Sequence, residues 1–306
     1  MYERILVPLD GSELAEGALP YAEGIAKRMR SEVVLITVCA SCDGLERPLR
    51  VYVDKKAEEL SSSGVRAHSL LVQGDAASEI LNSAEKNCIG LIVISTHGLS
   101  GVSRWALGSI ANKVLQESQI PTLLIKPSES ETASADRELR SILVSLDGSH
   151  FAEAIIPYVE VLAQGMDSEV VLLRVVEPVK LPRLDSYGHW VDLDKYEKDI
   201  SAEAEREAKH YLSERERALQ RKGVKVTSAS LPGNPPDTIL QYAEDSSVSL
   251  IALSTHGFSG NYQVGLRQRC LQSHRKLFKA GSACATIAAP LQRLVYSDAG
   301  HTAQQR

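Results

Sequence analysis

Short runs of β-branched and aliphatic residues alternate along the chain with longer segments whose apolar positions follow a helical spacing. The short runs lack regularly alternating polar positions, so both faces of each strand should be buried. For the first half of the chain, this pattern predicts strands at 4–10, 32–38, 65–72, 91–95 and 122–126 and helices at 13–29, 52–62, 76–87 and 108–117. Strands separated by helices indicate an α/β fold with a mostly parallel sheet covered by helices on both faces.

The first predicted helix has a recognisable start and one internal irregularity. Ser12 is suited to cap it, and Glu13 falls in its first turn. Pro20 lies inside the predicted helix and lacks a backbone donor, so it should kink the helix or remove one of its hydrogen bonds.

The same pattern occurs twice. Residues 5–38 recur at 142–175 without a gap, and twenty of these 34 positions are identical. The segment LIVISTHGLSG at 91–101 returns as LIALSTHGFSG at 250–260. A repeat of well over a hundred residues indicates a duplicated domain and not a short solenoid unit.

The length of 306 residues suits two domains of about 150 residues, each able to bury its own core. We predict a first domain at 1–127 and a second at 139–292, each with a five-stranded sheet. The polar, Ser/Glu-rich segment 128–138 reads as the linker between them, and 293–306 as a disordered tail.

The second copy diverges after Gly260, where the likeness ends within one residue. Arg267 and Gln268 stand where the first copy has Gly108 and Ser109. The sequence after Gly260 contains no clear final strand, so the last strand of the second sheet is doubtful. We therefore expect the last strand of the first domain to lack a partner in the second domain.

A one-nucleotide frame change after Gly260 accounts for this divergence. Codons compatible with residues 261–270, read with the first nucleotide removed, can encode I-T-R-W-A-L-G-S-V, which restores the RWALGS of 104–109 in register. Residues 279–290, treated in the same way, can encode a strand similar to that at 122–126. The alternative is a diverged tail that folds in its own way.

Composition narrows the class of protein. A hydrophobic content of 43%, with 24% charged residues and a net charge of −5, is ordinary for a soluble protein and gives no basic face for nucleic acid or anionic membrane. No apolar run reaches the roughly 18 residues of a membrane span, and no secretory signal is expected. The five scattered cysteines favour a reducing cytoplasm over a disulfide framework, and the Cys39/Cys42 pair has no second pair to form a zinc site.

Two loops carry the candidate chemistry and should meet at the carboxyl edge of the sheet, where open α/β folds bind ligands. One contains Asp10 and follows the first strand. The other runs from Ser95 to Gly98 and is followed, nine residues later, by Gly108 and Ser109 at a helix start. Glycines let backbone N–H groups approach a phosphate, and a helix start adds partial positive charge.

These motifs resemble those of the universal stress protein family, over both copies up to Gly260. Nucleotide-binding members of that family carry G-x-x-G, nine residues, then G-S or G-T, and this chain has S-T-H-G, nine residues, then G-S. The departure is Ser95, where the pattern has glycine, and serine is small enough for us to expect tolerance. VPLDGS and SRWALGSIANKV are also similar to family motifs.

The resemblance implies two tandem adenine-nucleotide-hydrolase-like domains that form a pseudo-dimer within the chain, with possible homodimers. It also implies ATP, with Mg²⁺, held by the first domain: Asp10 and Val38 at the adenine and ribose end, Ile94 and Ser95 along the ribose, and the Gly98 and Gly108 loop at the phosphates. The implied contact residues are Pro8, Leu9, Asp10, Val38, Ile94, Ser95, His97, Gly98, Gly108, Ser109 and Ile110.

Other interpretations stay open at this point. Gly98 and Gly108 can be ordinary turn and helix-start residues, and Asp10 can simply cap a helix. His97 can act as a general base, or it can order its loop or stack on a ligand, while Trp105 can pack against the sheet or stack on adenine. No nucleophile and base are identifiable as a set, so no catalytic residue is predicted.

The leading function is therefore an ATP-binding, stress-linked regulatory protein. One alternative is a scaffold of the same family that acts by association without nucleotide. The other is a slow ATP hydrolase or phosphotransferase.

Overall fold

The computed structural model of the chain describes residues 1–41, 44–97, 107–126, 139–180, 193–254 and 285–289. Its strands are β1 (Arg4–Pro8), β2 (Glu32–Cys39), β3 (Arg66–Gln73), β4 (Leu91–Ser95), β5 (Thr122–Ile125), β6 (Ser141–Ser145), β7 (Glu169–Val176), β8 (Lys225–Pro232), β9 (Leu250–Ser254) and β10 (Ala285–Ala289). Its helices are α1 (Glu13–Glu16), α2 (Leu19–Met29), α3 (Glu46–Ser62), α4 (Ala76–Lys86), α5 (Ser109–Glu117), α6 (His150–Glu153), α7 (Ile156–Met166), α8 (Leu193–Gln220) and α9 (Pro235–Asp245).

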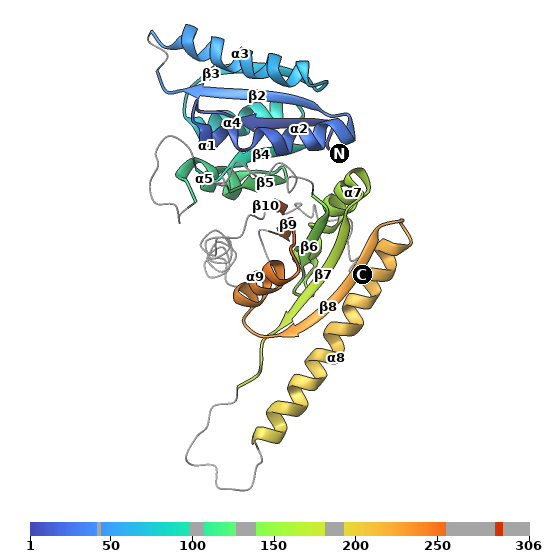
Figure 1. Ribbon diagram of the computed structural model, residues 1–306. Helices are drawn as coiled ribbons and strands as arrows, with labels where there is room; N and C mark the ends of the chain where they lie inside the picture. Colours follow the sequence, from blue (N-terminus) through green and yellow to red (C-terminus); the bar gives the residue numbers. More distant parts are fainter. Residues whose placement is uncertain (42–43, 98–106, 127–138, 181–192, 255–284, 290–306) are drawn as a thin grey trace, which may run out of the picture.

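The strands join in one sheet with the order β3-β2-β1-β4-β5-β10-β9-β6-β7-β8 (Figure 1). Neighbouring strands are parallel within each half, and the two halves meet where β5 pairs antiparallel with β10. The predicted α/β fold with mostly parallel five-stranded sheets is confirmed. The predicted linker and tail lie outside the described residues.

The doubtful last strand of the second domain is present as β10, so the expectation that β5 would lack a partner is wrong. Leu123 of β5 pairs with Ile287, and β10 also pairs in parallel with β9. Thr286, Ile287 and Ala288 are almost fully buried. A central strand is held mainly by backbone hydrogen bonds on both sides, and the β-branched Thr286 and Ile287 suit it, so large side chains are not required.

The two halves share one core as well as one sheet. A continuous apolar cluster lies on the face that α2 and α7 cover, and it contains residues of both halves. At this junction the Tyr2 hydroxyl donates to the Tyr158 carbonyl at 2.9 Å, and Arg28 Nη1 donates to the Met166 carbonyl at 3.3 Å. These contacts give the pseudo-dimer within the chain that the resemblance implies.

The predicted helix 13–29 is two helices, α1 and α2. Pro20 lies in the first turn of α2, where the N–H that it lacks would have no intrahelical partner, so the helix begins there and is not kinked. The second copy divides in the same way, into α6 and α7. The helix predicted at 52–62 begins earlier, at Glu46.

Helix α8 has 28 residues, whereas its counterpart in the first half, α3, has 17. It buries only Ala208, Leu212 and Leu219, so most of its charged surface faces solvent. In the part of the chain that the structure describes, neither α8 nor any other helix is both long and apolar enough to cross a membrane.

The sequence favours free cysteines over disulfide bonds, and one cysteine differs from this expectation. Cys39, at the end of β2, is disulfide-bonded. Cys88 is a free, exposed thiol. Cys42, the other half of the C-x-x-C, lies outside the described residues.

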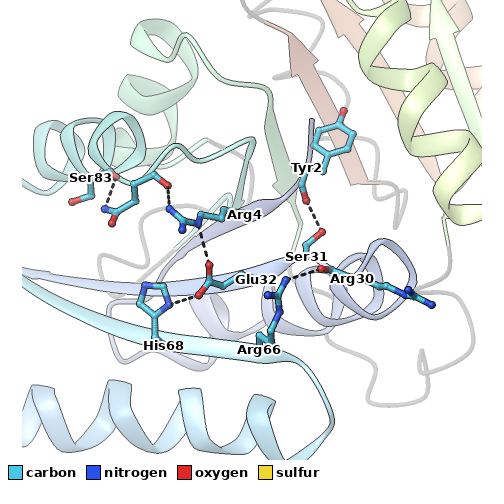
Figure 2. A network of polar contacts seen from close by, with 9 residues as sticks. Tyr2, Arg4, Arg30, Ser31, Glu32, Arg66, His68 and Ser83 are labelled. Carbon is cyan, nitrogen blue, oxygen red and sulfur yellow. Dashed lines mark hydrogen bonds and ion pairs between the residues drawn. The ribbon is translucent and has the colours of Figure 1, made fainter.

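The amino edge of the first sheet is crosslinked by side chains (Figure 2). Glu32 accepts from Arg4 Nε at 3.0 Å and lies 3.3 Å from His68 Nδ1, so it joins β1, β2 and β3. Arg4 also donates to the Asn87 carbonyl at 2.9 Å, which ties the end of α4 to β1. The polar groups of this edge are used in holding the strands, and the loops with candidate chemistry lie at the opposite edge.

Gly11 and Gly24 make a matched pair for testing backbone strain in the first domain. Gly11 has φ +87, which favours glycine, whereas Gly24 lies inside α2 with nothing within 4 Å of an added Cβ. We expect Gly11→Ala to lower the free energy of unfolding by about 1–2 kcal/mol. Gly24→Ala should raise it by about 0.5–1 kcal/mol. Urea unfolding measures the free energy of unfolding of both variants. Changes of the same sign would contradict the conclusion that Gly11, but not Gly24, is held in a conformation that favours glycine.

Candidate functional site

The first loop leaves β1 and turns directly into α1. Leu9 N donates to the Ile36 carbonyl at 2.8 Å, which extends the pairing with β2 past the end of β1. Asp10 Oδ1 accepts from both the backbone N (3.0 Å) and the Oγ (2.6 Å) of Ser12. Ser12 Oγ in turn accepts from Ala15 N at 3.1 Å, so Ser12 caps the helix as predicted. Asp10 shapes the loop, and Ser12 is the cap.

The second loop is anchored by Thr96, which the sequence analysis did not single out. Thr96 N donates to the Ile125 carbonyl at 2.8 Å, and its own carbonyl accepts from Gly108 N at 2.8 Å. Thr96 is fully buried. It therefore joins the end of β4 to the start of α5, and this contact brings the two ends of the S-T-H-G-(nine)-G-S motif together.

Gly108 is required by this approach of the two backbones. A Cβ on Gly108 would lie 3.0 Å from the Thr96 carbonyl oxygen, which is closer than ordinary contact. The φ of Gly108 is −58, so the requirement comes from space and not from backbone strain.

Helix α5 starts without a side-chain cap. Gly108 is its N-cap residue and offers no side-chain acceptor, and the Asn112 N–H to Gly108 carbonyl bond (2.9 Å) is the first intrahelical one. Ser109 and Ile110 are exposed. The first N–H groups of such a helix carry partial positive charge, which suits a phosphate or another anion.

His97 has a buried ring nitrogen that lacks a hydrogen bond. Its Nδ1 lies 2.9 Å from Thr96 Oγ1, and its backbone N donates to Ser95 Oγ at 3.4 Å. His97 Nε2 has no partner among the residues that the structure describes. A buried polar atom without a partner is costly, so a ligand or water that supplies the bond would be stabilising here.

The remaining predicted residues lie on the same edge of the sheet. Pro8 and Val38 are half-buried at the ends of β1 and β2, while Ile94 and Ser95 are buried at the end of β4. β1 and β4 are parallel neighbours, and α1 contacts β4. The two loops therefore emerge side by side. The contact of each residue with a ligand stays a prediction.

Several residues of the sequence predictions lie outside the described parts of the chain: Gly98, Trp105, Arg267 and Gln268. The structure therefore does not test their assigned places. The frame change proposed after Gly260 stays a prediction in the same way.

A polar cluster beside the first loop was missed from the sequence. The Tyr52 hydroxyl donates to Glu16 Oε1 at 2.9 Å, and Lys56 Nζ lies 2.8 Å from Glu16 Oε2. Burial raises the pKa of Tyr52, and the hydrogen bond to Glu16 and the charge of Asp10 raise this pKa further. The cluster thus connects α1 and α3 close to Asp10.

The second half repeats this cluster. The Tyr211 hydroxyl donates to Glu153 Oε1 at 2.9 Å, and Arg215 Nε donates to the same oxygen at 2.9 Å. In both halves a tyrosine is followed four positions later by a basic residue, Tyr52 by Lys56 and Tyr211 by Arg215, and this repeated pair could have revealed the cluster from the sequence. It is hard to see in the sequence because the segment between β7 and α8 is longer than its counterpart in the first half.

The sequence model of the universal stress protein family matches residues 1–126 and 138–274. A universal stress protein of Bacillus subtilis is 28% identical over 148 residues, which are 41% of this chain and 100% of that protein. One from Methanocaldococcus jannaschii is 32% identical over 149 residues, which are 43% of this chain and 86% of that protein.

Among solved structures, a universal stress protein from Archaeoglobus fulgidus matches with a TM-score of 0.68 at 18% identity. The match covers 95% of this chain and 99% of that one, which shows that the two share the tandem fold.

The Tyr52 hydrogen bond can be tested through stability and its pH dependence. We expect Tyr52→Phe to lower the free energy of unfolding at pH 7 by about 1–2 kcal/mol, because the charged Glu16 loses a donor. The folded protein holds the pKa of Tyr52 above its ordinary value of 10.0, so this contribution is complete below pH 10.0 and is lost as the pH rises further. The difference between the native chain and Tyr52→Phe should therefore shrink by pH 11.

Urea unfolding at pH 7 and 11 makes the comparison. Tyr196→Phe is the control, because Tyr196 is 58% exposed on α8. Equal effects of the two substitutions at pH 7 would contradict a role for the Tyr52 bond.

Proposed function

We propose that this chain, which belongs to the universal stress protein family, binds ATP with its first domain and serves a regulatory role in stress. The observation that carries the proposal is the contact between the Thr96 carbonyl and Gly108 N. It sets the uncapped start of α5 at the carboxyl edge of the sheet, next to the loop that follows β1.

The residues at this edge fit a triphosphate. The free N–H groups at the start of α5 and the Ser109 hydroxyl are donors for phosphate oxygens. The unpartnered His97 Nε2 is a further group that a ligand can satisfy. Gly98 would complete this phosphate end, and Mg²⁺ would arrive with the triphosphate.

The other end of the site fits a nucleoside. Pro8 and Leu9 precede Asp10, whose carboxylate is held at the edge by Ser12. We assign Asp10 and Val38 to the adenine and ribose, with Ile94 and Ser95 along the ribose. The support for this assignment is the common edge and the resemblance to the family motif.

The proposal describes a binder and not an efficient enzyme. Among the residues described at this edge, His97 and Asp10 have the chemistry of a general base, but His97 Nδ1 is engaged by Thr96 and the Asp10 carboxylate by Ser12. The hydroxyl beside His97, Thr96 Oγ1, belongs to a fully buried residue, and among the described residues His97 Nε2 has no partner that would orient the ring as a base.

A substitution of Ser109 gives the sharpest test of the phosphate end. Gly108→Val would also disturb the contact with Thr96, so a loss of binding there could be purely structural. Ser109→Ala leaves the backbone intact and removes one donor. We expect at least about tenfold weaker ATP binding by isothermal titration, because a hydrogen bond to a charged group is lost.

Adenosine and a distant serine provide the controls. Adenosine lacks phosphates, so its affinity should be the same for the native chain and Ser109→Ala. Ser62→Ala, at the exposed end of α3, should bind ATP like the native chain. Unchanged ATP affinity in Ser109→Ala would remove the start of α5 from the site. A native chain that binds no ATP would favour a scaffold that acts by association.

Turnover separates the proposal from an ATP hydrolase. With Mg²⁺ present, steady hydrolysis should stay far below the roughly 1–10³ per second of dedicated enzymes. Phosphate release measured over hours, with Ser109→Ala alongside, tests this expectation. A rate within that range that Ser109→Ala abolishes would establish an enzyme instead.

A further inference from the structure

The two repeats differ at one position beside the first loop. The ungapped alignment of the repeats places Thr37 of β2 opposite Arg174 of β7. The strand registers agree, because Thr37 pairs with Leu71 in β3 and Arg174 pairs with Ser230 at the matching place in β8. The same position of the fold therefore holds a short hydroxyl in one half and a long cation in the other.

Arg174 fills the space beside the first loop of the second domain. Its guanidinium carbon lies 5.3 Å from the centroid of the Tyr211 ring. Gly148 also lies close to it: an added Cβ there would be 3.1 Å from that carbon and 3.2 Å from both terminal nitrogens. The guanidinium thus lies close to both the aromatic ring and the loop, and its contact with the ring is favourable for a cation.

The equivalent space in the first domain is open. An added Cβ on Gly11 would meet nothing within 4 Å, although the backbone conformations match, with φ +87 at Gly11 and φ +91 at Gly148. Thr37 is too short to reach over the loop. It is 1% exposed, and its Oγ1 has no hydrogen-bond partner among the residues described.

The tyrosine and its carboxylate partner correspond in the two halves, although Arg215, in place of Lys56, also lies 5.3 Å from the centroid of the Tyr211 ring. The bond from Tyr52 to Glu16 and the bond from Tyr211 to Glu153 are both 2.9 Å long. The second domain therefore keeps the Asp-Gly-Ser turn, the serine cap and the tyrosine. It has Ser145 in place of Pro8 and Arg215 in place of Lys56, and the side chain that lies against Gly148 is Arg174.

We infer that the residue at this position decides which repeat accepts a nucleoside: Thr37 leaves the first domain open, and Arg174 closes the second. The inference rests on the proposed function, since it concerns the nucleoside end of that site. It is independent of the Arg267–Gln268 segment, because it involves no phosphate contact. A nucleoside could enter beside Gly148 only by displacing the guanidinium from Tyr211 and leaving that charge without its ring.

Exchanging the two residues in the full chain tests this inference. Thr37→Arg should bind both ATP and adenosine at least about tenfold more weakly than the native chain by isothermal titration. Thr37→Val is the matched control, because it keeps the shape and removes the unpartnered hydroxyl, and it should bind like the native chain. Circular dichroism and thermal melting show whether each variant is folded.

The reverse exchange, Arg174→Thr, keeps the inference testable even where Thr37→Arg does not fold. Adenosine should saturate the native chain at one molecule per chain, and Arg174→Thr should add a second, weaker site. Adenosine is the probe because it needs no phosphate loop.

Three outcomes would overturn the inference. The first is native-like binding by a folded Thr37→Arg, and the second is a single adenosine site in Arg174→Thr. The third is a native chain with two ATP sites of which Arg174→Thr loses one, because Arg174 would then be a phosphate ligand. A native chain that binds neither ATP nor adenosine would overturn the proposed function together with this inference.

Discussion

The requirement that strands within a sheet find backbone partners on both sides determines the architecture of this protein. β5 and β9 would both be edges without β10, and the antiparallel pairing of β5 with β10 closes the sheet between the two halves. Because this pair is antiparallel while the strands within each half are parallel, the carboxyl edges of the two halves face opposite ways. The loops at the carboxyl edge of the first half and those of the second half therefore lie at opposite edges of the sheet. One ligand cannot contact both sets.

Each half positions its first loop with the same few bonds. Leu9 N to the Ile36 carbonyl (2.8 Å) corresponds to Leu146 N to the Leu173 carbonyl (2.9 Å). The serine caps of α1 and α6 also correspond, at 3.1 and 3.0 Å. The duplication therefore acts as an internal control: where the backbones agree, a difference between the halves comes from side chains. Arg174 in place of Thr37 is such a difference.

The sequence predicted the strands, the parallel sheets, the duplication and the Ser12 cap, because each depends on local apolar pattern or on a short-range hydrogen bond. It failed for β10, since the side chains of Ala285–Ala289 give a weak strand pattern and the strand is specified by its two neighbours. It also failed for the single helix at 13–29, because Pro20 favours a helix start as well as a kink. Thr96 was missed since its role lies in its backbone, and Tyr52 because its partner Glu16 is 36 positions away in sequence.

The second domain is bound to the first by structure whether or not it binds a ligand. It supplies β10 to the edge of β5, and α7 packs against α2 with Gly165 placed closely over the side chain of Met29. The apolar cluster under these helices is continuous across both halves, so removing one half would expose core residues of the other. A half that stabilises its partner in this way can lose its own ligand chemistry without loss of the fold. The position of Arg174 against Gly148 and the Tyr211 ring is consistent with this role, because a side chain of the domain itself occupies the space beside its first loop.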